Sequence, residues 1–142
     1  MTDSSQRRSQ TGLTHENEKG EVRMVDISQK EITPRVATAE GEIHMRLDVM
    51  QRLMKNETAK GDALAVARVA GIQAMKKTAD LIPLCHPLQT TAATIDYEFD
   101  RQHKRVIVRS SVTVVERTGA EMEALTGATI ALLCDIIVSD DK

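Results

Sequence analysis

Aromatic side chains are nearly absent from this 142-residue sequence, which has no tryptophan, one tyrosine and one phenylalanine. Modules that bind single-stranded nucleic acid stack bases on aromatic side chains, and this chain offers few such platforms. The formal net charge is −2, so there is no overall positive field to hold a polyanion. Both features argue against nucleic acid as a partner.

Cysteine and long apolar runs are also scarce. Cys85 and Cys134 lie far apart and form no Cys-x-x-Cys motif, so neither a zinc ribbon nor a disulfide framework is indicated. A zinc site that adds His86 and His103 is disfavoured by the spacing. No apolar run reaches the roughly 18 residues of a membrane span, and the polar N-terminus lacks a signal-peptide core. We expect a cytoplasmic protein with no membrane partner, metal or cofactor.

The rest of the composition suits one globular domain. Hydrophobic residues make up 41% of the chain and charged residues 28%, enough for a core of Leu, Ile, Val, Ala and Met. Residues 1–20 are the exception, because they are polar and have few large apolar side chains. We expect this tail to be disordered and residues 21–142 to form a single domain.

Periodicity in the first half of the domain predicts one strand and two helices. Residues 31–45 alternate loosely in polarity, and Gly41 marks a bulge or kink. Apolar residues then recur at helical spacing over residues 47–54. Asp62 is a good N-cap for the strongest helix, over residues 63–80, which is rich in alanine.

The second half predicts a hairpin and a further helix. Residues 90–99 and 105–115 are β-prone, and the polar turn 100–104 joins them. Alternating valines make one face of the second strand apolar. A helix is predicted over residues 121–133. The order of elements predicts an α+β, ferredoxin-like (split βαβ) fold, in which an antiparallel sheet has helices packed on one face.

Residues 81–87, Leu-Ile-Pro-Leu-Cys-His-Pro, separate the long helix from the hairpin. Pro83 and Pro87 lack amide donors and bias the residues before them toward extended backbone, so the segment is a stiff connector. It holds Cys85 and His86 in fixed directions, and a positioned imidazole can transfer protons near neutral pH. A helix-ending loop with a surface histidine is the alternative interpretation.

Three more residues are candidates for chemistry. Lys60 stands in a turn before the long helix, where it can reach a phosphate or carbonyl group. Glu121 and Glu123 begin the last helix but lie two positions apart, so they do not share one helix face. Each also has a structural explanation, because a turn lysine is normally solvated and N-terminal carboxylates stabilise the helix dipole.

Several stretches resemble one enzyme family over a single register from Met24 to about Leu133. The stretches are 24–28 (Met-Val-Asp-Ile-Ser), 60–62 (Lys-Gly-Asp), 65–68 (Ala-Val-Ala-Arg), 70–72 (Ala-Gly-Ile), 81–87 and 118–126 (Thr-Gly-Ala-Glu-Met-Glu-Ala-Leu-Thr). In these stretches the chain resembles the molybdenum cofactor biosynthesis protein C family, the cyclic pyranopterin monophosphate synthases.

The resemblance implies a ferredoxin-like subunit in a homohexamer, a trimer of dimers, with active sites between subunits. The implied substrate is 3′,8-cyclo-dihydro-GTP, supplied by a radical SAM GTP cyclase. The implied reaction rearranges it to cyclic pyranopterin monophosphate and releases diphosphate. By matched position, the substrate-binding residues would be Arg35, Leu84, Cys85, His86, Met122 and Glu123. The catalytic acid–base set would be Lys60, His86, Glu121 and Glu123.

The chain departs from the family after the last helix. Where the family has Tyr-Asp-Met-Cys-Lys, the places of its catalytic Asp and Lys hold Ile137 and Asp140. Asp135 stands about half a helical turn out of register, so we do not expect it to substitute. The family's final strand and Gly-Gly-Lys-Ser-Gly tail are also missing from the sequence. An atypical, shortened C-terminus leaves two alternatives, a catalytically impaired structural or binding subunit of the same fold and a regulatory ligand-binding domain.

Overall fold

The computed structural model describes residues 19–59 and 61–139, with side chains described as far as Asp135. The expected disorder of residues 1–20 therefore falls almost wholly outside the described part of the chain. Three antiparallel strands form a sheet in the order β1-β3-β2. The strands are β1 (Thr33–His44), β2 (Thr90–Asp100) and β3 (Arg105–Glu116). The helices are α1 (Leu47–Met54), α2 (Ala63–Met75), α3 (Thr78–Leu81) and α4 (Glu121–Ser139).

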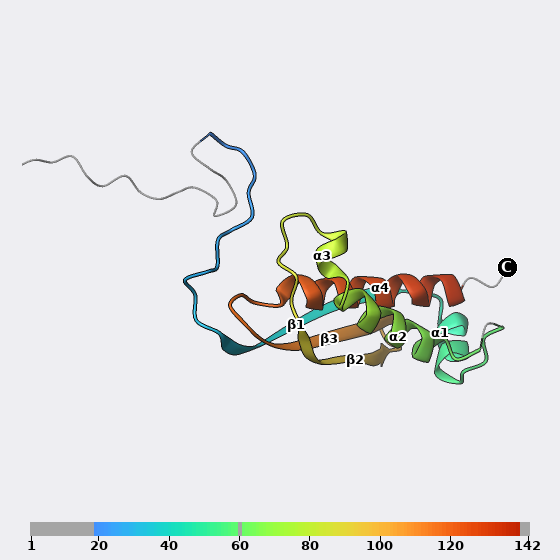
Figure 1. Cartoon of the computed structure of the whole chain (residues 1–142). Helices are drawn as coiled ribbons and strands as arrows, with labels where there is room; N and C mark the ends of the chain where they lie inside the picture. Colours follow the sequence, from blue (N-terminus) through green and yellow to red (C-terminus); the bar gives the residue numbers. More distant parts are fainter. Residues whose placement is uncertain (1–18, 60, 140–142) are drawn as a thin grey trace, which may run out of the picture.

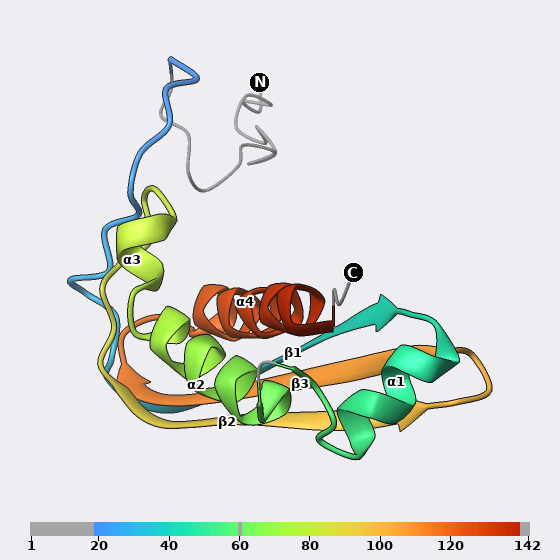
Figure 2. The same cartoon turned by 90° about the vertical axis from the view of Figure 1, so that its right-hand side faces the viewer.

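Helices α2 and α4 lie side by side on one face of the sheet (Figures 1 and 2). Helix α4 packs mainly over β1 and β3, and α2 packs over β2. Helix α1 lies at one end of this layer, and α3 lies toward the other end. The predicted α+β, ferredoxin-like arrangement with helices on one face is confirmed. In the described part of the chain, no helix is long and apolar enough to cross a lipid bilayer.

The core lies between β3 and the two long helices, and it contains small residues on the helix side. Val108, Val112 and Val114 are fully buried on the inner face of β3, as the alternating valines predicted. Helix α4 presents alanines to them at a spacing of three or four residues. A Cβ atom added at Gly71 of α2 would lie 2.8 Å from the carbonyl oxygen of Gly127 in α4. The two helices therefore approach closely enough that only glycine fits at their contact.

Gly41 was expected to mark a bulge or a kink, and no bulge forms there. Strand β1 pairs with β3 without a register shift, and Gly41 lies opposite Val108. A Cβ atom at Gly41 would lie 2.7 Å from Leu132 of α4, so the glycine makes room for the helix above the strand. The irregularity in the sheet lies instead in β2, between Thr90 and Ala92.

Two helix ends also differ from the predictions. The helix expected over residues 63–80 stops at Met75, because the Thr78 hydroxyl donates to the carbonyl oxygens of Met75 (2.9 Å) and Ala74 (3.3 Å). The amide of Lys77 also donates to Ala74 at 3.0 Å, a tight turn that ends the helical pattern before the short helix α3. Helix α4 was expected to end near residue 133, but its backbone continues to Ser139.

Candidate active site

The segment between α3 and β2 forms neither helix nor strand over residues 82–89, as its two prolines predicted. It begins in a turn, in which the Ile82 amide donates to the Thr78 carbonyl oxygen at 2.8 Å. Leu84 has a φ of 64°, a left-handed conformation that costs energy for a residue with a side chain. The connector is therefore a strained, defined turn that directs the residues after Leu84.

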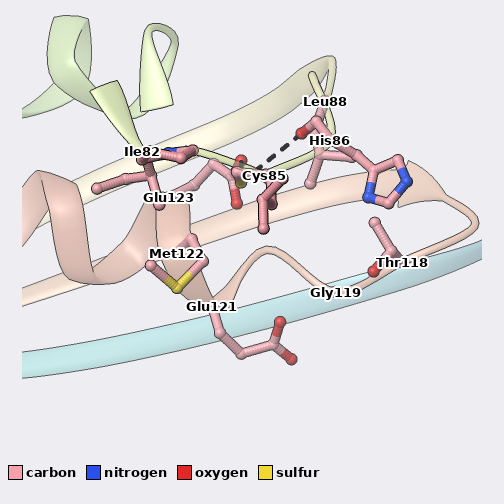
Figure 3. Close-up of a pocket in the computed structure, with 11 residues that line it drawn as sticks. Ile82, Cys85, His86, Leu88, Thr118, Gly119, Glu121, Met122 and Glu123 are labelled. Carbon is pink, nitrogen blue, oxygen red and sulfur yellow. Dashed lines mark hydrogen bonds between the residues drawn. The ribbon is translucent and has the colours of Figure 1, made fainter. Parts of the chain in front are cut away.

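A cavity of about 370 Å³ lies where this connector faces the start of α4 (Figure 3). The connector contributes residues 82–86 and Leu88 to its lining. The other wall consists of Thr118, Gly119 and residues 121–123. Two segments that are thirty positions apart in sequence thus form one concave site, which is the usual form of a small-molecule pocket.

Glu123 is the buried acidic group of this cavity. Its residue is 2% exposed, and its Oε2 atom has no hydrogen-bond partner in the described part of the structure. Burial raises the pKa of the carboxyl group, and the neighbouring charge of Glu121 adds to that rise. The Cys85 thiol lies beside it, with Sγ 3.9 Å from Oε1. Glu123 is thus held closer to neutrality than an ordinary glutamate, as a proton donor requires.

Glu121 occupies a different environment although it lines the same cavity. It is exposed, and in Figure 3 its side chain points away from Cys85 while Glu123 lies beside that thiol. A Cβ atom at Gly119 would collide with the Glu121 carboxylate, so the glycine leaves room for it. Both carboxylates stand in the first turn of α4, where the helix dipole favours negative charge.

His86 is half-buried and lines the cavity. A hydrogen bond from the Ser28 amide (2.9 Å) lowers the pKa of Asp26, and the charge of His86 contributes to the same shift. Arg117 holds this part of the chain by donating to the carbonyl oxygens of Ser28 (3.0 Å) and Lys30 (2.6 Å). The motif at residues 24–28 therefore lies at the same end of the molecule as the cavity.

The structure brings most of the candidate residues together. The members that line the cavity are Leu84, Cys85, His86, Glu121, Met122 and Glu123. Arg35 does not line it; it lies on β1, and its Nε atom donates to the Glu116 carbonyl oxygen at 3.2 Å. Lys60 and Asp140 lie outside the described residues. That the gathered residues bind substrate or transfer protons stays a prediction.

Sequence reasoning missed part of the lining. Thr118 and Gly119 line the cavity, although the sequence predicted no site role for these two residues of the 118–126 stretch. Lys76 and Lys77 line a smaller cavity of about 80 Å³ that shares Glu123 with the main one. Their position shortly before the connector was the feature of the sequence that could have indicated a place near the site. Across the described residues, no group of three or more His, Cys, Asp or Glu side chains is placed to hold a metal ion.

Known proteins of one family resemble this chain over most of its length. The model of the MoaC family matches residues 24–138, beyond Leu133, where the resemblance was expected to end. A protein named cyclic pyranopterin monophosphate synthase from Desulforapulum autotrophicum is 44% identical over 134 residues, which are 93% of this chain and 82% of that protein. Proteins of the same name from Roseiflexus castenholzii and Heliobacterium modesticaldum are 49% and 50% identical over 121 residues. Those alignments cover 85% of this chain and 77% and 76% of the relatives.

Proposed function

Because this chain belongs to the MoaC family, we propose that it is a cyclic pyranopterin monophosphate synthase, a lyase of molybdenum cofactor biosynthesis. It converts 3′,8-cyclo-dihydro-GTP to cyclic pyranopterin monophosphate and diphosphate. The observation that supports this best is the cavity that buried Glu123 shares with the connector residues Cys85 and His86, in which the Cys85 thiol lies beside the Glu123 carboxyl group. A radical SAM GTP cyclase supplies the substrate, and both enzymes work in the cytoplasm.

The groups in the cavity suit this reaction. Opening a purine ring and closing a cyclic phosphate require several proton transfers, and each needs a positioned acid or base. Glu123 has a raised pKa and serves as a proton donor. Exposed Glu121 serves as a carboxylate base, and His86 accepts or donates a proton according to the step. Three groups with different environments thus divide the proton transfers among them.

A diphosphate leaving group needs cations beside it. Among the residues that the structure describes, neither lysine nor arginine lines the walls of the cavity. Charge that develops on a departing diphosphate is stabilised by lysine or arginine at hydrogen-bond distance. Lys76 and Lys77 line only the adjoining smaller cavity. Further cations must therefore come from outside this wall, and Lys60 is our candidate.

The shape of the subunit favours a second copy as the source of Lys60. Helix α4 extends away from the cavity, and about 21 Å of helix axis separates Glu123 from Ile137 at ~1.5 Å per residue. The described residues just before Lys60 follow α1, which lies at that far end (Figure 1). Basic side chains gather there too, around a cleft whose lining includes His44, Arg46, His103 and Lys104, and the first three of these are paired with carboxylates. We propose a homohexamer, a trimer of dimers, in which this end of one subunit closes the cavity of another.

Mixing two inactive variants tests the shared site. Lys60→Ala and His86→Ala chains, co-expressed in equal amounts, should recover about a quarter of wild-type activity, because that fraction of shared sites receives both intact residues. His86→Ala mixed with Glu123→Gln is the matched control, and it should recover none, since one subunit supplies both residues. A first mixture no more active than its parents would show that Lys60 and His86 do not act across subunits.

The direct test of the function is product formation by the purified chain. With 3′,8-cyclo-dihydro-GTP, the chain should release diphosphate and form cyclic pyranopterin monophosphate in equal amounts. Absence of both products, under conditions in which a relative from Roseiflexus castenholzii forms them, would overturn the proposal.

Positions 137 and 140 bear on the rate of this reaction. Asp135 does not supply a missing carboxylate to its own subunit's cavity, because it is fully buried far along α4. We expect the double variant Ile137→Asp, Asp140→Lys to turn over about tenfold faster or more, since it restores one acid–base pair. Equal single-turnover rates would show that the chain does not need this pair. Detectable binding with no turnover before the double substitution would favour the impaired-subunit alternative.

A further inference from the structure

The Cys85 thiol and the Glu123 carboxyl group form a pair that the proposed proton transfers do not yet explain. The sulfur lies 3.9 Å from Glu123 Oε1 and 3.8 Å from the carbonyl oxygen of His86 (Figure 3). Its single proton can point to either acceptor, and it is a weak donor. Glu123 Oε2 has no partner in the described structure although the residue is almost completely buried. The two carboxyl oxygens therefore stand in unequal environments.

Other charged groups surround this carboxyl group at longer range. Glu121 precedes it on α4, and its charge opposes ionisation of Glu123. His86 lies on the connector with its ring pointing away from Glu123 (Figure 3), and both Glu121 and His86 line the main cavity. The smaller cavity, behind Glu123, is lined from the α2–α3 side by Lys76, Lys77 and Asp80. Among the described residues, Cys85 is the one whose side chain lies within hydrogen-bond distance of the Glu123 carboxyl oxygens.

We propose that Cys85 is a positioning residue that holds Oε1 of Glu123 and thereby fixes the orientation of the carboxyl group whose proton goes to the substrate. When Glu123 gives up that proton, the thiol hydrogen bond stabilises the carboxylate that remains, and the thiol keeps its own proton. The role assigned to Glu123 depends on the proposed function. The coupling between thiol and carboxyl group does not, because it exists without substrate.

Each of the two groups shifts the pKa of the other in a definite direction. A thiol hydrogen bond stabilises the carboxylate, so it lowers the pKa of Glu123 against the larger rise caused by burial. The carboxylate in turn repels a thiolate and accepts the thiol proton, so it raises the pKa of Cys85 beyond the rise caused by desolvation. Removing either partner should therefore shift the other in a predictable direction.

Titrating the thiol tests the coupling without any substrate. In a Cys134→Ala background, the rate of alkylation by iodoacetamide against pH reports the pKa of Cys85. Glu123→Gln should lower this pKa by about half a unit to one unit. Glu121→Gln is the matched control, because it removes a nearby carboxylate that does not contribute to the shift of the thiol, and it should leave the pKa unchanged. An unchanged pKa in Glu123→Gln, or equal shifts in both variants, would overturn the pairing.

The pH profile of kcat/KM tests the positioning role. Cys85→Ala should move the alkaline limb to higher pH by about half a unit to one unit, because the pKa of Glu123 rises when its donor is lost. Cys85→Ser keeps a donor and should return the limb to the wild-type position. If serine and alanine give the same profile, the thiol only fills space and the positioning role is wrong. If the thiol titration succeeds and no variant, wild type included, forms product, the proposed function fails while the pairing stands.

Discussion

Glu123→Gln should slow turnover by about 10²–10⁴-fold and change substrate affinity by only a few-fold. Glutamine has nearly the same shape, still accepts the Cys85 hydrogen bond through its amide oxygen, and cannot donate an acidic proton. Glu123 is almost completely buried in the cavity wall, and a side chain of nearly the same shape leaves the packing of that wall intact. The loss should therefore fall on the chemical step.

The measurement is single-turnover diphosphate release, with equilibrium binding of the substrate measured on the same protein. Glu98→Gln is the matched control, since Glu98 is exposed on β2 and does not line the cavity. It should leave both quantities unchanged. A Glu123→Gln chain that turns over within about tenfold of wild type would show that this carboxyl group is not the proton donor.

Asp135→Asn should stabilise the protein above neutral pH. Asp135 is fully buried on α4, and neither carboxyl oxygen has a hydrogen-bond partner in the described structure. Burial raises its pKa to about 7 from an ordinary value of 3.8. Because the folded state favours the protonated form, stability is greatest below about pH 4 and falls as the pH rises toward 7. At ~1.4 kcal/mol per pKa unit, the loss above pH 7 amounts to about 4 kcal/mol.

Urea unfolding at pH 5 and pH 8 measures this effect. The Asn variant cannot ionise, so its free energy of unfolding should lack this fall and exceed that of wild type by about 2–4 kcal/mol at pH 8. Asp96→Asn, a substitution at an exposed position of β2, should follow the wild-type pH dependence. An Asn variant that loses stability with pH in parallel with wild type would show that Asp135 does not ionise within the fold.

The sheet was predictable because its pattern is local. In β3, alternating valines face one way, and burial on that side alone decides the orientation of the strand. The end of α2 was not predictable, because the sequence around Lys77 suits a helix and the Thr78 hydroxyl ends it through contacts that depend on backbone geometry. Gly41 was misjudged for a related reason. The glycine leaves room for the side chain of Leu132, which lies on α4 and is far away in sequence.

At the candidate site, too, local features were predictable from the sequence and tertiary contacts were not. The prolines of the connector were readable, and the resemblance paired the connector with the start of α4. Spacing could not tell which of Glu121 and Glu123 is buried, because two residues that are two positions apart on a helix face different ways. The buried state of Asp135 was equally hidden, since a carboxylate near a chain end is normally exposed. Only the packing of α4 against the sheet places it inside.

A crystal structure of the Glu123→Gln chain with bound 3′,8-cyclo-dihydro-GTP tests the central claim most directly, because the slow variant should retain the substrate. We expect the ring system in the cavity between the connector and the start of α4, beside Cys85 and His86. The phosphates should lie next to Lys60 of a second copy. A nucleotide bound in the cleft of His44 and Lys104, with the connector cavity empty, would contradict that claim.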